Sequence, residues 1–305
     1  MNGIICFDIG GTKISKAVIR FVDTKKGYEI IDYEKEKNPR EAEEIKDIML
    51  SYCCRMKKAY RITKVAVSAA CVVDTERLEI LRAKGNYGIE KFSFDFLTRK
   101  GFTLKVDNDG HCFVIGEHLF GNVRSSKILL GLVIGTGIGG GFFFNGLSFG
   151  GAHNTAMEVS HMQVNAAPDA PICAGCRRRG CWQVYSGGGG IERMYYRKTG
   201  LKKTAEQIFS DMAKDVYAKK IVAEAEEYMA IGLANVLNLL DPDTIVLGGS
   251  ISQQKKFMER VIAKTNKKVF NKKARYNFKD SKLKEYANLL GAASLWIIAY
   301  FKEAE

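Results

Sequence analysis

The sequence predicts an α/β fold of two domains with a cleft between them. The chain has 305 residues, which is enough for two domains of ordinary size. Glycine-rich turns at residues 10–13 and 135–141 each lie between apolar, β-rich segments, one in each half of the chain. Helical patterns dominate after the second turn. We expect a small domain over residues 1–118, completed by a closing helix over residues 288–305, and a large domain over residues 119–287.

The first half of the chain predicts strands that alternate with helices. Apolar runs rich in β-branched residues predict strands, and apolar positions that recur every three or four residues predict helices. We expect strands over residues 4–9, 14–22, 65–73 and 104–106, and helices over residues 41–60 and 111–120. The polar tetrapeptide Asp107-Asn108-Asp109-Gly110 therefore lies between a strand and a helix.

The second half repeats a strand, a glycine turn and a strand, and then becomes mainly helical. We expect strands over residues 128–134, 142–144 and 244–247, and helices over residues 204–216, 217–240 and 288–301. The long central helix ends at Asp241-Pro242, because proline cannot continue a helix. The last of the three strands leads into a further pair of glycines, Gly248 and Gly249.

The formal net charge is +13, and most of it comes from one stretch. Residues 253–284 hold twelve basic residues against two acidic ones. A basic surface can bind nucleic acid, but no helix-turn-helix pattern accompanies this one. We therefore favour a solvated, lysine-rich helical face and expect no nucleic-acid partner.

The sequence favours a cytoplasmic protein that does not cross a membrane. The N-terminal apolar run has no basic region before it and is interrupted at Asp8, which is unlike a signal peptide. The longest apolar stretch, residues 128–144, holds six glycines and is too short to span a bilayer. Five cysteines are scattered, as reduced thiols usually are: Cys6, Cys53, Cys54, Cys71 and Cys112.

The first glycine turn has the composition of a phosphate-binding loop. Glycines let backbone N–H groups cradle an anion, a threonine hydroxyl can donate, and an aspartate at the strand end can hold Mg²⁺. The residues concerned are Asp8, Gly10, Gly11, Thr12 and Lys13. The alternative is a tight hairpin with a surface lysine.

The second glycine turn contains a G-x-G-x-x-G match at Gly135, Gly137 and Gly140. A dinucleotide site requires a helix to begin at such a loop, whereas residues 142–144 predict a strand. We therefore reject a nicotinamide site and interpret this turn as a second phosphate hairpin. Two such hairpins, one in each half, can hold the phosphates of one nucleotide from both sides of a cleft.

Asp109 is a candidate general base. A carboxylate between a strand and a helix, near a cleft, can accept a proton from a substrate hydroxyl, which is the role that phosphoryl transfer requires. The alternative is that this tetrapeptide serves only as a helix N-cap and turn.

The most specific local pattern combines one histidine and three cysteines: His161, Cys173, Cys176 and Cys181. Their spacing matches a closed tetrahedral zinc site, in which no position is open for water, so the metal would be structural. Its expected role is to pin the loop that bears Glu158 and His161 to the loop that bears Gln183. The alternative is a set of unlinked reduced thiols.

Six motifs occur in one order: Asp-x-Gly-Gly-Thr-Lys, Asn-Asp before a helix, Gly-Thr-Gly-x-Gly-Gly-Gly, Glu-x-x-His, Cys-x-x-Cys-x4-Cys and Leu-Gly-Gly. In this combination the sequence resembles the ROK family (repressors, open reading frames and kinases) over essentially the whole chain. The resemblance implies the two-domain, actin-like (ribonuclease H-like) ATPase fold of the actin, Hsp70 and sugar-kinase group.

The resemblance also implies a role for each motif. The ATP-binding positions would be Asp8, Gly10, Gly11, Thr12 and Lys13, then Gly135, Thr136, Gly137 and Gly139, and on the adenosine side Gly248 and Gly249. The sugar-binding positions would be Asn86, Asn108, Asp109, Glu158, His161 and Gln183. Asp109 would take the proton from the sugar 6-hydroxyl, Asp8 would hold magnesium, and His161 would serve both zinc and sugar.

The implied activity is an ATP:hexose 6-phosphotransferase of carbohydrate metabolism, similar to glucokinase, that uses ATP and Mg²⁺ and carries structural Zn²⁺. Glucose is the expected substrate, with N-acetylmannosamine, fructose, allose or a β-glucoside as alternatives. Gln183 stands where the family has a glutamate, which favours a sugar substituted at carbon 1. A homodimer is expected from the family.

Two other functions compete with this one. A repressor of this family carries a DNA-binding domain ahead of the kinase-like body, and only seven residues precede Asp8 here. A non-catalytic, sugar-sensing regulator would not need Asp8, Asp109 and both glycine loops. Because all of these are retained, we favour the kinase.

Overall fold

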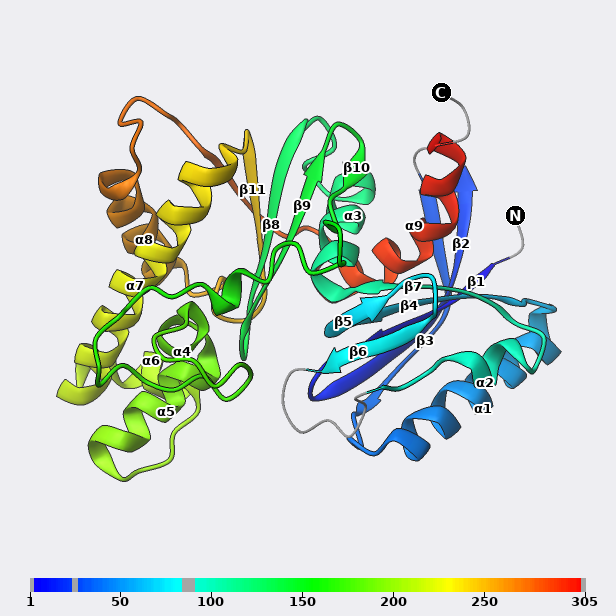
Figure 1. Ribbon diagram of the computed structural model, residues 1–305, viewed down its shortest axis with the longest axis horizontal. Coiled ribbons are helices and arrows are strands. Elements are labelled where there is room, and N and C mark those ends of the chain that lie inside the picture. The colour runs from blue at the N-terminus through cyan, green and yellow to red at the C-terminus, as the bar shows by residue number, and fades with distance from the viewer. Residues whose placement is uncertain (1–2, 24–26, 84–90, 303–305) are drawn as a thin grey trace. The chain divides into compact units, whose positions relative to one another are not determined.

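The computed structural model describes residues 3–23, 27–83 and 91–302 of the chain (Figure 1). It divides into two compact units. The first comprises Met1–Leu129, Gly141–Ala156 and Ser281–Glu305, and the second Leu130–Gly140 and Met157–Asp280. The boundary expected after residue 118 differs from this division, since residues 119–129, 141–156 and 281–287 belong to the first unit. Functional domains with the expected boundaries stay a prediction.

A five-stranded sheet of order β3-β2-β1-β4-β7 forms the centre of the first unit. Its strands are β1 (Ile4–Ile9), β2 (Lys13–Asp23), β3 (Gly27–Lys37), β4 (Lys64–Ala69) and β7 (Thr103–Asn108). β1 is antiparallel to β2, whereas β1, β4 and β7 are parallel to one another. The register places Asp8, Ser68 and Asp107 in one row, so the carboxyl ends of three strands bring polar residues to one edge of the sheet.

Helices lie on both faces of this sheet (Figure 1). The helices of the first unit are α1 (Ala42–Tyr60), α2 (Asp95–Thr98), α3 (Asp109–Phe120) and α9 (Ala287–Lys302). α1 buries Ile45, Met49, Tyr52 and Met56, a three- to four-residue spacing that puts one apolar stripe on the sheet. A separate hairpin, β5 (Cys71–Asp74) and β6 (Glu79–Ala83), and a 3₁₀ turn, η3 (Lys284–Tyr286), complete the regular elements.

α3 and α9 cross at two glycines. A β-carbon at Gly291 would overlap the Cys112 carbonyl group, and a β-carbon at Gly116 would overlap that of Ala287. The two backbones therefore approach more closely than any side chain would permit. Because α3 begins with Asp109, this crossing fixes the position of that residue within the unit.

We expect Gly291→Ala to destabilise the protein by about 1–3 kcal/mol, because the added methyl group forces two tightly packed helices apart. Urea unfolding of the variant measures this loss. Gly27→Ala is the matched control, since the nearest described atom to a β-carbon there would be in the Val22 side chain, at 3.7 Å. Equal urea midpoints for the two variants would contradict the close crossing.

The second sheet has the order β10-β9-β8-β11-β12, of which β10, the start of β8 and the end of β9 are counted with the first unit. Its strands are β8 (Ile128–Ile134), β9 (Ile138–Phe144), β10 (Leu147–Ser148), β11 (Thr244–Gly248) and β12 (Asn277–Asp280). β9 follows the second glycine turn directly. The rejection of a dinucleotide site is thereby supported, because no helix begins at this loop.

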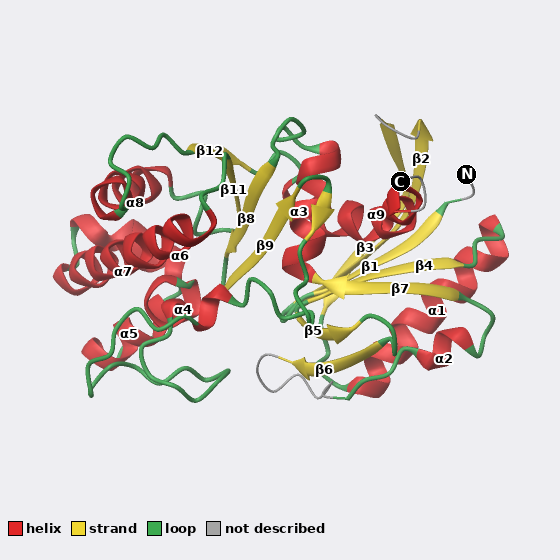
Figure 2. Cartoon of the chain, turned by 45° about the horizontal axis from the view of Figure 1, so that its top comes forward, coloured by secondary structure: helices red, strands yellow, loops and turns green. Residues whose placement is uncertain are grey.

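The helices of the second unit are η1 (Val159–His161), α4 (Trp182–Ser186), α5 (Gly188–Thr199), α6 (Ala205–Ser210), η2 (Asp211–Ala213), α7 (Val216–Leu240) and α8 (Lys255–Lys268). The long helix α7 packs beside α8 and α4 (Figure 2). Trp182 at the start of α4 is fully buried, and its indole fills the space that a side chain at Gly232 of α7 would need. The core of this unit therefore extends to the residue that follows Cys181.

Three expected elements are wrong in their extent. The strand expected over residues 142–144 begins at Ile138, so residues 139–141 belong to β9 and not to the turn. The strand expected over residues 65–73 breaks at Ala70, whose N–H still donates to the Ile9 carbonyl, at 3.0 Å, while β5 leaves the sheet to pair with β6. The helix expected over residues 204–216 ends at Ser210, because Asp215 caps α7 by accepting from the N–H groups of Tyr217 and Ala218. The polar residues between the two helical patterns therefore separate α6 from α7, and Asp215 caps α7.

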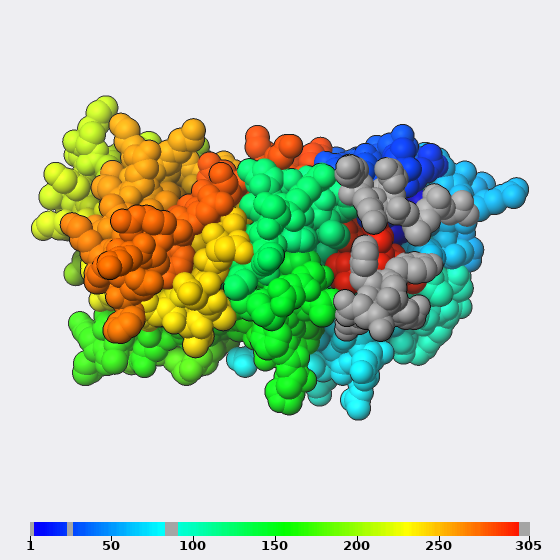
Figure 3. Space-filling view, turned by 90° about the horizontal axis from the view of Figure 1, so that it is seen from above, coloured from blue at the N-terminus to red at the C-terminus, as the bar shows by residue number. Residues whose placement is uncertain are grey.

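The basic stretch forms a solvated helical face only in part, since six of its twelve basic residues lie on α8 and the other six follow it. α8 buries Phe257, Met258, Val261 and Thr265 and exposes lysines on its other side. Figure 3 shows α8 and the segment after it, in orange, at the surface. Among the described residues, no helix is long and apolar enough to cross a membrane.

Candidate active site and metal centre

The first glycine turn joins β1 to β2. It is held by hydrogen bonds from Asn38, a residue that belongs to none of the sequence motifs. Asn38 is buried, donates from Nδ2 to the Gly10 carbonyl at 2.7 Å, and its own N–H donates to the Thr12 carbonyl at 3.0 Å. Gly10 N–H closes the turn on the Lys13 carbonyl at 3.0 Å. Thr12 and Lys13 remain exposed, which leaves their side chains available to a phosphate.

Asp8 lies at the end of β1, just before this turn. Its Oδ1 accepts from the Ser68 hydroxyl at 2.9 Å and from Asn288 Nδ2 at 3.0 Å. Burial raises the pKa of Asp8, and the bonds from Asn288 and Ser68, with the charge of Lys35, only partly oppose this. A divalent cation beside the carboxylate would favour its ionised form, so the site suits the magnesium role that the sequence suggests.

The second glycine turn is fixed by the start of α5. The N–H of Gly188 donates to the Gly135 carbonyl at 2.8 Å, and the N–H of Gly189 donates to the Thr136 carbonyl at 2.9 Å. The sequence analysis missed this support, although four consecutive glycines at 187–190 were the signal. The carbonyl groups of Gly135 and Thr136 are thus hydrogen-bonded to α5, while the Thr136 side chain remains exposed.

The structure brings Gly248 and Gly249 to the second glycine turn. Gly249 has a left-handed φ of 88°, and a β-carbon there would overlap the backbone of Ile134, the residue before Gly135. The N–H of Ile251 donates to the Ile134 carbonyl at 2.9 Å. Within the second unit, the two predicted nucleotide-binding segments are thus neighbours.

Asp109 is the first residue of α3, directly after β7. Asn108 caps the helix by accepting from the Gly110 N–H at 2.8 Å, and its Nδ2 donates to the Cys71 carbonyl at 2.9 Å. Asp109 Oδ1 also accepts from Gly110 N–H, at 2.9 Å. A helix N-terminus stabilises an ionised carboxylate, which is the form that can accept a proton. The helix cap, Asn108, and the candidate base, Asp109, are therefore different residues.

Glu158 and His161 lie at the two ends of the 3₁₀ turn η1. His161 Nε2 is 4.0 Å from Glu158 Oε2, so the two side chains lie on the same side of the turn. The other ring nitrogen, Nδ1, lies 3.6 Å from Cys173 Sγ. One histidine thus faces a carboxylate with one nitrogen and a sulfur cluster with the other.

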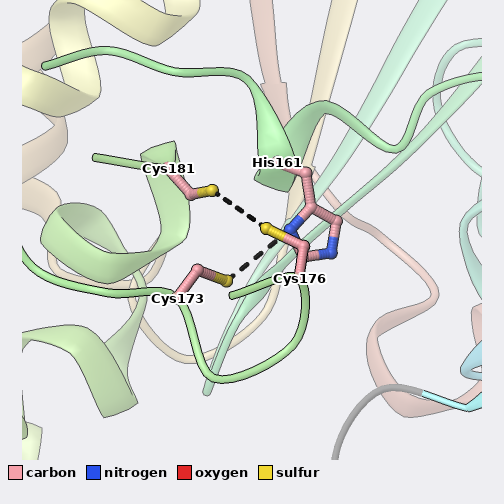
Figure 4. A group of neighbouring side chains, drawn as sticks. All are labelled: His161, Cys173, Cys176 and Cys181. Atoms are coloured by element: carbon pink, nitrogen blue, oxygen red, sulfur yellow. Dashed lines mark hydrogen bonds between the residues drawn. The ribbon is translucent and has the colours of Figure 1, made fainter. Parts of the chain in front are cut away.

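The four predicted zinc ligands converge (Figure 4). Their ligand atoms all lie within 4.8 Å of one another, and the sulfur atoms of Cys176 and Cys181 are 3.4 Å apart. Four ligands at zinc distances on a tetrahedron would lie about 3.8 Å from one another, so modest adjustment would bring these atoms onto one ion. The residues present fit a closed Cys₃His site.

The acidity of the three thiols also fits a bound cation. Burial raises the pKa of Cys173, but hydrogen bonds from His161, the Cys176 backbone and Gln183 outweigh it and lower the pKa to about 5. The pKa of Cys181 rises to about 12, because burial and the neighbouring thiols oppose another negative charge. A positive ion would favour the thiolate form of all three.

Gln183 faces the sulfur cluster. Its Nε2 donates to Cys173 Sγ at 3.2 Å, a bond that the glutamate usual in the family could not make because an ionised carboxylate has no N–H. Glutamine in place of glutamate at position 183 therefore adds a hydrogen bond to Cys173. Its predicted contact with carbon 1 of a sugar stays a prediction.

The predicted sugar-binding residues are divided between the two units. Asn108 and Asp109 belong to the first unit, and Glu158, His161 and Gln183 to the second. Asn86 lies outside the described residues. Ser68, Asn288 and Asn38 are site neighbours that the sequence analysis missed, since none belongs to a motif.

Comparisons with known proteins agree with this organisation. An N-acetyl-D-glucosamine kinase of Histophilus somni is 32% identical over 263 residues, which are 81% of this chain and 83% of the relative. A ROK family glucokinase from Streptomyces griseus, solved with glucose and AMPPNP, is 25% identical, with a TM-score of 0.79 over 96% of this chain and 98% of its own.

A ROK hexokinase from Thermus thermophilus has the same fold, with a TM-score of 0.81, 23% identity and 99% coverage of both chains. The α/β, actin-like fold expected from the sequence is thereby confirmed. The sequence model of the ROK family matches residues 4–298. The chain belongs to the ROK family.

Proposed function

We propose that the protein transfers a phosphoryl group from ATP to the 6-hydroxyl of a hexose. The observation that carries the proposal is Asp109, a partly exposed carboxylate at a helix N-terminus, capped by Asn108 and located at the carboxyl edge of a parallel sheet. Asp8 lies along the same edge. Relatives named as sugar kinases support the same class of reaction.

Each candidate residue has a chemical task in this reaction. Asp109 accepts the proton of the attacking hydroxyl, which makes the oxygen a better nucleophile. Backbone N–H groups of the two glycine turns, with Thr12 and Thr136, bind the phosphates. Asp8 holds Mg²⁺, which when bound neutralises charge on the phosphates. Gly248 and Gly249 border the nucleoside end of the ATP site.

We further propose that His161, Cys173, Cys176 and Cys181 bind structural zinc. If His161 binds zinc through Nδ1, its Nε2 does not contact the metal and faces Glu158. The Nε2 atom and the Glu158 carboxylate can then both hydrogen-bond to hydroxyl groups of the sugar. The metal would stiffen the loops that carry these side chains, and Gln183 would support Cys173 from outside the coordination sphere.

Glucose and N-acetylglucosamine are the two leading substrates. Glucose is the sequence-based expectation, and N-acetylglucosamine enters because the curated relatives are named for it. The sequence analysis did not include that sugar. N-acetylmannosamine, fructose, allose and a β-glucoside stay as alternatives. We also propose a homodimer and a cytoplasmic location, as expected from the sequence.

The decisive assay is Mg·ATP-dependent ADP release with each of these sugars, and with none. We expect a saturable response to glucose or N-acetylglucosamine, well above the rate without sugar, because hydroxyl attack requires a bound acceptor. Mass spectrometry of the product locates the phosphate at carbon 6. Sugar binding by calorimetry without turnover would instead establish a non-catalytic sugar sensor.

A further inference from the structure

His111 is a buried histidine whose two ring nitrogens both face acceptors. Only 1% of its surface is exposed. Nδ1 lies 2.9 Å from Asp107 Oδ1, and Nε2 lies 3.3 Å from the Ala156 carbonyl oxygen. Neither a carboxylate nor a carbonyl oxygen can donate, so both contacts are hydrogen bonds only if both nitrogens carry protons. With Asp107 ionised, the geometry therefore favours the positively charged imidazolium.

The electrostatic surroundings agree with this form. Burial lowers the pKa of His111, but the hydrogen bond and charge of Asp107, the Ala156 carbonyl and the charge of Asp109 together raise it above its usual value. The positive charge in turn attracts the Asp109 carboxylate two residues earlier in the chain.

Asp107 connects three parts of the first unit. Besides the bond from His111, its Oδ1 accepts from the Asn108 N–H at 2.7 Å and from Asn154 Nδ2 at 3.3 Å. Asn154 also donates to the Val73 carbonyl at 3.0 Å. One carboxylate oxygen thus joins the end of β7, the first turn of α3 and the loop that contains Asn154.

The loop over residues 150–156 is closed by the Ala156 N–H, which donates to the Gly150 carbonyl at 3.0 Å. It contains left-handed backbone at Gly151 (φ 74°) and Asn154 (φ 51°) and continues into Glu158. Glycine and asparagine both tolerate this conformation, so the backbone alone does not fix the position of the loop. The loop is held to its surroundings by His111 at the Ala156 carbonyl, and by Asp107 and the Val73 carbonyl at Asn154.

We propose that Asp107 and His111 are positioning residues, an ion pair that holds the Asn108-Asp109 helix start and the loop leading to Glu158 in one arrangement. This rests on the proposed kinase function, in which Asp109 is the base and Glu158 binds the sugar. The pair would fix the base for proton transfer from a sugar hydroxyl without touching the substrate. A glutamine at position 111 would carry no charge, and its single amide nitrogen would have to donate to both acceptors.

The first test does not depend on turnover. Nitrogen NMR of the labelled protein, with its four histidines, should show both His111 nitrogens protonated at neutral pH, and the signals should be lost in His111→Gln. Hydrogen exchange should be faster over residues 150–156 in His111→Gln and Asp107→Asn. His153→Gln is the matched control, since His153 is exposed in the same loop. A neutral His111, or unchanged exchange in both variants, would overturn the ion pair as the support of this loop.

The second test uses kinetics with whichever sugar the wild type phosphorylates. Each single variant should lose about tenfold in kcat with KM for ATP unchanged, and the double variant should be no slower than the singles, because both remove one interaction. The positioning role would be contradicted if the losses in kcat were additive in the double variant. It would also be contradicted if a fall in thermal stability alone accounted for the losses. A wild type that turns over no sugar would refute the kinase function and with it the positioning role, whereas the NMR and exchange results would still decide the ion pair.

Discussion

Asp109→Asn should reduce kcat for sugar phosphorylation by a factor of about 100 to 10,000, which is the usual loss when a positioned general base is removed. The asparagine side chain has the same shape but cannot take the proton of the attacking hydroxyl. Its carbonyl oxygen can still accept from the Gly110 N–H, as Asp109 Oδ1 does at 2.9 Å. The start of α3 should therefore be preserved, and the loss should be chemical.

The measurement is ADP release at saturating sugar and Mg·ATP, together with calorimetry of sugar binding. Sugar affinity should change by only a few-fold, because the amide can still hydrogen-bond a hydroxyl group. Asp95→Asn is a matched control, since Asp95 is also the first residue of a helix, α2, and is exposed. Turnover near the wild-type rate in Asp109→Asn would show that another group accepts the proton.

The sequence was most informative where glycine turns separate apolar runs. The strand pairs β1/β2 and β8/β9 flank the two glycine turns as expected, because turn residues and apolar strands are local signals. The edge strand β3 was missed. It is half-buried and highly charged, and its Glu34 pairs across the sheet with Lys16 at 3.1 Å, so its composition resembles that of a loop.

α5 was missed for a different reason. It begins with Gly188, Gly189 and Gly190, residues that disfavour a helix. A β-carbon at Gly190 would lie 2.5 Å from the carbonyl oxygens of Gln183 and Val184, so close packing against α4 requires glycine there. Tertiary contact overrides local propensity at this point, and no local pattern reports such a contact.

In the candidate site, too, residues close together in the sequence could be predicted and distant partners could not. The convergence of His161 with the three cysteines could be predicted, because they lie within 21 residues and have a spacing typical of zinc sites. The partners of Asp8 could not, since Ser68 and Asn288 are 60 and 280 residues away along the chain. The pairing of Asp107 with His111 has a four-residue helical spacing, but the third partner, Ala156, is distant in sequence.

Removal of the metal should have the second large effect. Protein purified without chelator should contain about one zinc ion per chain, and Cys173→Ser or Cys181→Ser should remove it. The melting temperature should then fall by on the order of 10 °C, because ligand coordination contributes several kcal/mol and three buried or half-buried thiols lose their common partner. Elemental analysis and thermal unfolding measure the two effects.

The loss of zinc should also weaken sugar phosphorylation selectively. In Cys173→Ser, His161 loses both the metal and the sulfur atom beside its Nδ1, and Gln183 loses the sulfur atom that accepts from its Nε2 at 3.2 Å. KM for the sugar should therefore rise more than KM for ATP, since the glycine turns are held by other contacts. Cys54→Ser is the control, because Cys54 is an exposed thiol on α1 and should keep both zinc and activity. Well-folded, active protein with less than half an equivalent of zinc would mean that the cluster works as free thiols, and the loop carrying Glu158 would then have to be stiffened from its other end, by His111 and Asp107.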